Sequence, residues 1–429
     1  MAPTSALNIA SHYATASRPP TLRSAQARET GAIRYNPRPA DSPLRTGWRS
    51  DGLQLFPEGS LAMNPDSTVH ESELRGLLAG YVDPYLGVTL EAAGALKAVQ
   101  VTDGAASVAV ELGFPAGRYA AELAAELERR ARSLPWLRQA QVAVTWRVAS
   151  HSVQNNLKPV QGIRNIIAVA SGKGGVGKST TAVNLALGLA YDGASVGLLD
   201  ADIYGPSQPQ MMGLSEEKPT SPDQRTMFAP EAYGLKVMSI GFLVDVEQPM
   251  VWRGPMVTQA LIQLLETTRW GELDYLIVDM PPGTGDTQLT LSQRVPVSGA
   301  VIVTTPQDIA LLDARKGLRM FQKVAVPVLG VVENMSTHVC SSCGFEEHIF
   351  GAGGGRRMAE QYGVELLAEL PLDIRIREQA DSGKPTVASE PESKLGRAYI
   401  DLARRTAARL VISGLQPTAA FPNITSEDT

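Results

Sequence analysis

The two cysteines of this 429-residue chain, Cys340 and Cys343, lie three positions apart in one short stretch of sequence. This spacing allows both thiolates to bind one soft metal centre, and zinc and iron–sulfur clusters both accept it. A tetrahedral sulfur site needs four thiolates, and one chain supplies two. If protein thiolates alone hold the metal or cluster, two chains must share the site.

Other interpretations of the cysteine pair remain open. A thioredoxin-like redox pair has the same spacing, but it opens a helix near the start of its own small fold, which is not the setting here. His338 and His348 lie nearby and are candidate ligands, although such a histidine is more often an ordinary loop residue. Two unrelated free thiols are a further alternative. Two cysteines are too few for a disulfide framework.

A glycine-rich segment predicts a phosphate-binding loop of the form G-x-x-x-x-G-K-[ST]. It follows an apolar strand pattern and opens a helical one, so backbone N–H groups and the helix N-terminus can face phosphate oxygens. Lys178 is expected to contact the β- and γ-phosphates of ATP, and Ser179 to bind Mg²⁺. Lys173, early in the loop, marks the deviant form of the motif. The predicted nucleotide-binding residues here are Gly172, Lys173, Gly174, Gly175, Val176, Gly177, Lys178, Ser179 and Thr180.

Carboxylates follow two other predicted strands. Asp200 and Asp202 come at the end of 196–200, and Asp279 ends 275–279. We expect Asp200 to support the metal and Asp279 to act as a Walker-B-type carboxylate. A lone aspartate is often a helix cap, but carboxylates at successive strand ends favour a metal–nucleotide site. The segment 281–286, Pro-Pro-Gly-Thr-Gly-Asp, is suited to sensing the γ-phosphate.

Asn334 follows another predicted strand, 328–332. Its amide is a candidate for reading the adenine edge, and an ordinary loop asparagine is the alternative. We therefore include Asn334 among the predicted nucleotide-binding residues.

The elements that must position these side chains alternate between strand and helix from 163 to 412. Short, fully apolar strands separated by helices indicate a parallel, doubly wound sheet covered on both faces. Ligands of such sheets bind at the carboxyl ends of the strands, where the motifs fall. The sequence therefore predicts an α/β fold with a P-loop domain over 163–412. The expected strands are 166–170, 196–200, 237–240, 275–279, 300–304, 328–332 and 365–368.

A smaller α/β domain is expected over 66–148. Its pattern predicts helices over 70–81 and 116–134 and a last strand over 141–148. Strands 95–102 and 106–112 are joined by Asp103-Gly104, a hairpin signal. We expect 149–162 to be a linker and 413–429 a flexible tail.

Residues 1–62 contain seven arginines and no lysine, and they lack apolar periodicity. We expect 1–65 to be a disordered extension. One interpretation is an organellar transit segment, and the other, which we favour, is that Met63 is the true start. The expected location is cytoplasmic, or organellar if the transit segment is genuine.

Bulk composition argues against some partners. The net charge is −5, which gives no electrostatic reason to expect nucleic acid or an anionic membrane. No uninterrupted apolar run reaches about 18 residues, so no transmembrane helix is expected. We therefore expect neither a nucleic-acid nor a membrane partner.

Taken together, these motifs resemble the Mrp/ApbC family of P-loop ATPases. Partitioning and cell-division ATPases share the deviant loop, so the loop alone does not single out one family. The CxxC pair after Asn-Met restricts the resemblance to the Mrp/ApbC family. It covers about 66–412, because the small domain is similar to the family's N-terminal module. The matching segments are 167–181, 199–207, 252–256, 279–286, 332–335 and 340–344.

The resemblance implies a SIMIBI-type P-loop fold and an ATP-hydrolysing carrier. Such a carrier binds a [4Fe–4S] cluster across a homodimer through Cys340 and Cys343 and delivers it to apo iron–sulfur proteins. Iron–sulfur scaffold proteins are further expected partners. The resemblance also implies that Lys173 reaches the partner's nucleotide and that Asp202 orients the attacking water. The expected catalytic residues are then Lys173, Lys178 and Asp202, and the cofactors are ATP, Mg²⁺ and the cluster.

One position departs from the family pattern. Phe114 precedes Pro115 where many relatives have a cysteine, so the remaining role of the small domain is docking or partner choice.

Three rival functions make different demands on the sequence. A positioning ATPase needs an amphipathic tail or a basic patch, and 414–429 is neither basic nor helical in pattern. A reductase like the nitrogenase iron protein takes its cluster cysteines from separate loops. A zinc-bridged dimeric regulatory ATPase remains open, and metal content would distinguish it.

Overall fold

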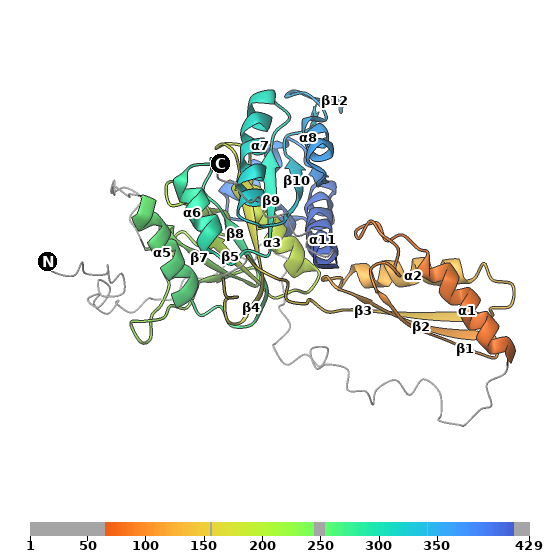
Figure 1. The fold of residues 1–429 in the computed structure, drawn as a ribbon. Helices are drawn as coiled ribbons and strands as arrows, with labels where there is room; N and C mark the ends of the chain where they lie inside the picture. The colour runs from red at the N-terminus through yellow and green to blue at the C-terminus, as the bar shows by residue number, and fades with distance from the viewer. Residues whose placement is uncertain (1–64, 155–156, 244–253, 341, 416–429) are drawn as a thin grey trace, which may run out of the picture.

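The computed structural model describes residues 65–154, 157–243, 254–340 and 342–415. These residues form a small α/β unit and a larger unit built around an eight-stranded sheet (Figure 1). Residues 1–64 of the predicted extension lie outside the described residues, as do Trp252 and Arg253 of the family resemblance, whereas Pro65 begins the first helix.

The small unit contains the predicted helix–hairpin–helix–strand order. Its elements are α1 (Pro65–Ala79), β1 (Leu96–Thr102), β2 (Ala105–Leu112), α2 (Tyr119–Ala131) and β3 (Gln139–Trp146). β1 and β2 pair antiparallel around Asp103 and Gly104, whose φ angles of 48° and 72° suit a tight hairpin turn. β3 pairs parallel with β2, so α2 crosses over the sheet. α2 begins later than predicted, because Gly117 N donates to Asp192 O in the larger unit.

The large sheet confirms the predicted parallel architecture. Its strands run in the order β13-β10-β9-β4-β8-β5-β7-β6, and every pair is parallel except β6 with β7. The antiparallel edge was not predicted, because β6 has only two residues. The strands are β4 (Ile163–Ser171), β5 (Val196–Asp200), β6 (Glu231–Ala232), β7 (Leu235–Ser239), β8 (Leu273–Asp279), β9 (Gly299–Thr304), β10 (Val328–Glu333) and β13 (Glu365–Glu369).

Helices flank this sheet (Figure 1). α3 packs against β8 and along α11, and α5 packs along α6. α11 continues three residues past the predicted domain end at 412, so the predicted tail begins as helix. No described helix is long and apolar enough to cross a membrane. The helices are α3 (Lys178–Tyr191), α4 (Gln208–Met211), α5 (Gly254–Thr267), α6 (Asp286–Arg294), α7 (Asp308–Lys323), α8 (Gly354–Tyr362), α9 (Ile374–Asp381), α10 (Thr386–Ser389) and α11 (Lys394–Leu415), with a 3₁₀ turn at Ile240–Phe242.

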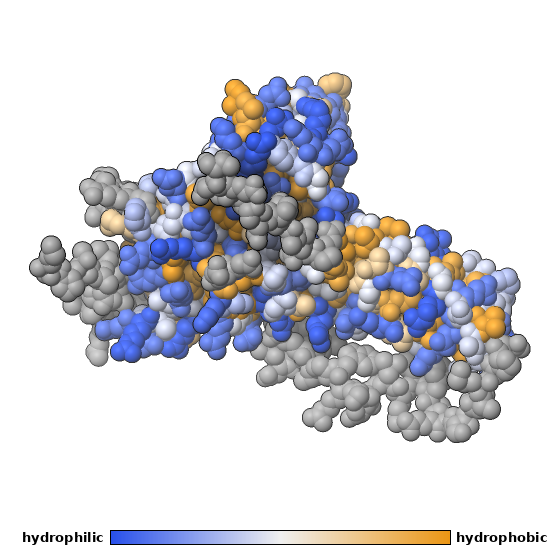
Figure 2. All heavy atoms as spheres, viewed as in Figure 1, coloured by the Kyte–Doolittle hydropathy of each residue, from blue (hydrophilic) through white to orange (hydrophobic). Residues whose placement is uncertain are grey.

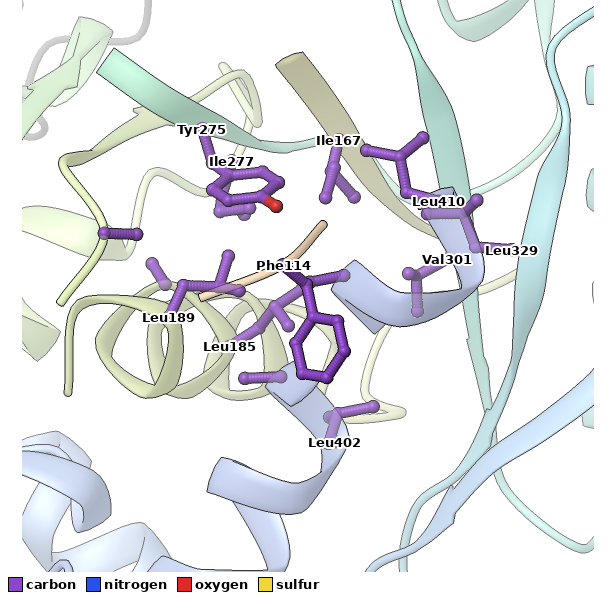
Figure 3. Packing of buried hydrophobic residues seen from close by; sticks show 14 of the residues in the cluster. Phe114, Ile167, Leu185, Leu189, Tyr275, Ile277, Val301, Leu329, Leu402 and Leu410 are labelled. Atoms are coloured by element: carbon purple, nitrogen blue, oxygen red, sulfur yellow. The ribbon is translucent and has the colours of Figure 1, made fainter. Parts of the chain in front are cut away.

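The two units share one apolar core. Phe114 of the small unit is fully buried, and Figure 3 shows its ring between Leu185 of α3 and Leu402 of α11. A Cβ added at Gly113 would lie 3.0 Å from the side chain of Val411 in α11. The small unit is therefore docked on the P-loop unit through buried aromatic and aliphatic contacts.

Candidate nucleotide site and cysteine loop

The glycines of the predicted phosphate loop are required for different reasons: backbone conformation, close packing or access for a ligand. Gly175 and Gly177 have φ angles of +81° and +83°, a conformation that favours glycine. A Cβ at Gly172 would lie 2.2 Å from the backbone of Asp313 in α7, so close packing requires that glycine. A Cβ at Gly174 would meet no atom within 4 Å. The exposed backbone at Gly174 is thus free to approach a phosphate closely.

Lys178, the first residue of α3, is a buried cation. Its side chain is 6% exposed, and Nζ lies 2.5 Å from Asp279 Oδ1 and 3.8 Å from Asp202 Oδ2. Nζ also lies 3.1 Å from Ser179 Oγ. The loop lysine, the serine that is predicted to bind Mg²⁺ and two of the predicted carboxylates therefore lie close together.

Asp200 and Asp279 are register partners on neighbouring strands β5 and β8, and both are fully buried. Burial, together with the negative charge of Asp279, raises the pKa of Asp200 to about 7. Burial also raises the pKa of Asp202, and the nearby Lys178 ammonium opposes that rise. Carboxylate and hydroxyl oxygens are the ligands that Mg²⁺ prefers, so the residues present fit this ion.

Backbone and hydroxyl donors fix the Asp200 carboxylate. Its Oδ2 accepts hydrogen bonds from Ser207 N at 3.0 Å, Gln208 N at 3.1 Å and Ser239 Oγ at 3.1 Å. Its Oδ1 accepts one from Asp202 N. These four hydrogen bonds hold the carboxylate in one orientation, and its support of a metal stays a prediction.

Asn334 joins the end of β10 to the phosphate loop. Its side-chain Nδ2 donates to Val176 O at 2.9 Å, and its backbone N donates to Thr304 O at 2.8 Å. A Cβ at Gly177 would lie 2.1 Å from Asn334 Nδ2, so the two residues fit only as a pair. The amide that we predicted to read adenine binds the loop backbone here, and adenine recognition stays a prediction.

The segment after Asp279 is also bonded to the loop. Gly283, with a φ of +102°, donates its N–H to Ser171 O at 3.0 Å, and Ser171 Oγ donates to Lys173 O. The side chain of Gln288 in α6 donates to Pro281 O. Hydrogen bonds through Ser171 therefore join the segment 281–286 to the start of the phosphate loop.

The cysteines lie at the tip of a short antiparallel hairpin formed by β11 (His338–Val339) and β12 (Glu346–Glu347). Cys340 N donates to Phe345 O at 2.9 Å, and Gly344 N donates to Cys340 O at 2.8 Å. Cys343 is exposed and Cys340 partly so. Hydrogen bonds from the N–H groups of Cys343 and Ser342 lower the pKa of the Cys340 thiol. The hairpin thus presents two adjacent thiols outward, one of them biased toward thiolate.

The neighbouring histidines face backbone carbonyls. His338 Nδ1 lies 3.1 Å from Leu372 O, and His348 Nδ1 lies 2.8 Å from Ser336 O. Within the described ranges, no group of three or more His, Cys, Asp or Glu side chains is placed to hold one metal ion. Among the described residues of one chain, the candidate ligands at the cysteine site are thus the two thiols.

Comparison with known proteins assigns the family. The family model for NUBPL iron-transfer P-loop NTPases, of the ParA group, matches residues 162–407. This chain belongs to that family. A second model, for iron–sulfur cluster assembly proteins, matches residues 71–144 of the small unit.

Several curated relatives are similar over most of their length. An iron–sulfur cluster carrier protein of Pseudomonas fragi is 58% identical over 65% of this chain and 97% of its own. One from Escherichia coli K12 is 50% identical over 83% of this chain and 96% of its own. The iron–sulfur cluster transfer protein NUBPL of Mus musculus is 55% identical over 59% of this chain and 80% of its own.

Among the family's motif residues, the structure brings Lys178, Ser179, Asp200, Asp202 and Asp279 together at the carboxyl ends of β4, β5 and β8. The cysteine hairpin lies farther along the chain, beyond Asn334, at the end of the molecule near α8 (Figure 1).

One buried residue of this site is not identifiable from the motifs. Gln208, at the start of α4, donates its Nε2 hydrogens to Ser179 O at 3.0 Å and Asp279 Oδ2 at 2.9 Å. The side chain is fully buried. A single glutamine carries no spacing signal, so only the tertiary structure could reveal this position.

Proposed function

We propose that this protein binds a [4Fe–4S] cluster as a homodimer and transfers it to apo-proteins, with ATP hydrolysis. The observation that carries the proposal is the outward pair of thiols on a hairpin in the same chain as a complete phosphate-loop site. The names of the similar proteins, iron–sulfur cluster carrier and transfer proteins, support it.

The surroundings of the thiols favour a shared site. Two thiolates from each protomer complete a four-thiolate set. Hydrophobic side chains flank them on the same segment: Val339 is 43% exposed, Phe345 65% and Ile349 52%. Hydrophobic side chains also stand out at the end of the molecule that carries α7 and β12 (Figure 2). Exposed apolar groups around a ligand pair are suited to being covered by a second protomer.

The nucleotide site supplies positioning and charge. Lys178 would leave its carboxylate partners for the β- and γ-phosphates, and Ser179 with Asp279 would hold Mg²⁺, which neutralises phosphate charge when bound. Asp202 would orient the attacking water, and Lys173 of a partner protomer would offset charge as the γ-phosphate leaves. No dedicated strong base stands among these side chains, so slow turnover is expected.

Few residues separate the phosphate-loop contact of Asn334 from the cysteine hairpin along the chain. Asn334 is bonded to the phosphate loop through Val176, and Cys340 follows it by six residues. Nucleotide-dependent movement of the loop would therefore reach the hairpin and alter how two protomers enclose the cluster. Client proteins would then receive the cluster when the enclosure opens. The proposed location is cytoplasmic, which the low cysteine content supports.

Reconstitution under anaerobic conditions tests the proposal. Purified protein is incubated with iron and sulfide, and iron, acid-labile sulfide, zinc and molecular mass are measured beside the Cys340→Ala/Cys343→Ala variant. About four irons and four sulfides per dimer, lost in the variant, are expected for a bridged cluster. One zinc per dimer without sulfide would overturn cluster carriage and favour the zinc-bridged regulatory ATPase.

A further inference from the structure

The buried Gln208 side chain contacts two elements of the candidate nucleotide site. It bridges α3, through Ser179 O, and β8, through Asp279 Oδ2. Its own backbone N–H donates to Asp200 Oδ2 at the end of β5. One residue therefore links the phosphate-loop helix with both strands that carry the buried carboxylates.

The orientation of the Gln208 carboxamide follows from its partners. Ser179 O and Asp279 Oδ2 both accept hydrogen bonds, so the nitrogen must face them and the oxygen must face away. That oxygen, Oε1, is buried and has no hydrogen-bond partner among the described residues. A buried acceptor without a donor is unfavourable and rare in folded proteins, so this oxygen needs a donor that the described residues do not supply.

We propose that Gln208 is a positioning residue for the metal of the bound nucleotide. Its Nε2 holds the Asp279 carboxylate, and its Oε1 accepts a hydrogen bond from a water of the Mg²⁺ shell. Mg²⁺ keeps several of its waters in nucleotide sites, so donors for such an oxygen accompany the ion. The inference rests on the proposed nucleotide function and adds a residue to it.

The two carboxylate oxygens of Asp279 have different partners, so Gln208 can orient the carboxylate independently of Lys178. Oδ1 pairs with Lys178, and Oδ2 accepts from Gln208. If Lys178 moves to a phosphate, the bond from Gln208 still fixes the carboxylate plane. Residues that orient metal-binding carboxylates in this way change metal affinity by about 10- to 100-fold when they are removed.

The test compares Gln208→Met with Gln210→Met. Methionine keeps length and flexibility but has no amide, and Gln210 is an exposed residue of the same short helix whose side chain contacts only Asp381 O at 3.3 Å among the hydrogen bonds described. Binding of a fluorescent ADP analogue is measured without Mg²⁺ and across an Mg²⁺ titration. We expect Gln208→Met to need about tenfold or more Mg²⁺ for half of the affinity gain. Binding without Mg²⁺ should stay within about threefold of the unaltered protein, and Gln210→Met should match that protein throughout.

Two further measurements keep the outcome decisive. If Gln208→Met does not fold, as judged by thermal unfolding, Gln208→Asn keeps the amide but shortens its reach and is expected to show the same Mg²⁺ shift. Mn²⁺ in place of Mg²⁺ gives a spectroscopic signal, and its line shape in the ADP complex should change in the Gln208 variant. An unchanged Mg²⁺ midpoint in a folded variant would overturn the role of Gln208 alone. Failure of the unaltered protein to bind ADP would overturn the proposed nucleotide function, and this inference with it.

Discussion

Lys178 has two physical roles at the residue scale. It is the predicted phosphate ligand, and it is also the cation that neutralises the fully buried Asp279 and lies near Asp202. Removing one partner of a buried ion pair leaves the other charge uncompensated. The phosphate-loop lysine therefore contributes to folding stability as well as to nucleotide binding.

We expect Lys178→Ala to lower the free energy of unfolding of the nucleotide-free protein by about 3–5 kcal/mol at pH 8, measured by urea denaturation. The loss should be smaller at pH 5. The Lys178 ammonium opposes the rise in the pKa of Asp200, so without it that native pKa lies further above the unfolded value of about 4. The native state then binds more protons than the unfolded state and loses stability as pH rises. Lys173→Ala, at a partly exposed loop position, is the control and should change stability by less than about 0.5 kcal/mol. Equal losses in the two variants would contradict the buried-pair argument.

The cysteine pair makes a second prediction at this scale. Because backbone N–H groups lower the pKa of Cys340, this thiol should alkylate with iodoacetamide faster than Cys343 at pH 7 in the metal-free protein. The sign follows from the shift: a lowered pKa raises the thiolate fraction below the ordinary thiol pKa, and the advantage should vanish above about pH 9.

Peptide mass spectrometry after timed alkylation distinguishes the two thiols. Cys343→Ala removes the side-chain hydrogen bond from residue 343 to Cys340 and should slow the alkylation of Cys340. Faster reaction of Cys343 at every pH would show that exposure, and not the hydrogen bonds, decides reactivity.

At the scale of elements, the end of β10 supports the phosphate loop. Asn334 reaches the loop carbonyl of Val176, and its fit against Gly177 leaves no room for a Cβ there. β10 therefore precedes the cysteine hairpin in the chain and, through Asn334 at its end, contacts the phosphate loop.

We expect Asn334→Ala to weaken ADP binding by about tenfold, since a buried carbonyl left without its donor costs about 1–3 kcal/mol. The same change should speed amide hydrogen exchange at 174–177 in the nucleotide-free protein. Isothermal titration and exchange mass spectrometry measure the two effects. A loss of ADP affinity with unchanged exchange would favour the direct adenine contact that the sequence predicts.

Elements with strong local patterns were predictable. Seven expected strands of the P-loop unit occur, because the strands of a parallel sheet covered on both faces leave short apolar runs in the sequence. The two-residue β6 and the β11–β12 ribbon were missed, since so few residues carry no periodicity. In the site, the motif residues were found from spacing, whereas Gln208 and the loop-holding bond of Asn334 depend on contacts between distant segments. The early start expected for α2 failed because Gly117 bonds to the other unit.

At the scale of the whole molecule, a buried polar network ties the small unit to the P-loop unit. Arg404 of α11 donates to Asp192 Oδ2 at 2.6 Å and to Tyr85 OH at 3.0 Å. Burial raises the pKa of Tyr85 to about 12, and its hydroxyl donates to Asp401 at 2.8 Å. Arg404 also lies 5.4 Å from the ring centroids of Tyr85 and Tyr119. Directional polar contacts, in addition to apolar packing, therefore fix the position of the small unit on the P-loop unit.

Arg404→Met should loosen this docking. Breaking the buried pair with Asp192 is expected to cost about 3–5 kcal/mol and to make the chain between 146 and 163 more sensitive to limited proteolysis. Arg405→Met, at the exposed neighbouring position, is the matched control. Equal proteolysis of the two variants would show that the apolar contacts around Phe114 are sufficient by themselves.

Helix α3 begins at Lys178 in the phosphate loop and ends at the cap residue Asp192, which binds Arg404 and the backbone of Gly117 and Arg118. Its 14 residues span about 21 Å as one stiff rod. Thermodynamic reciprocity then applies to its two ends: if nucleotide binding displaces Asp192 and changes the affinity of the small unit for any partner, that partner must change nucleotide affinity by the same factor. A client that docks more than 20 Å from the phosphates would in this way regulate the nucleotide without touching it.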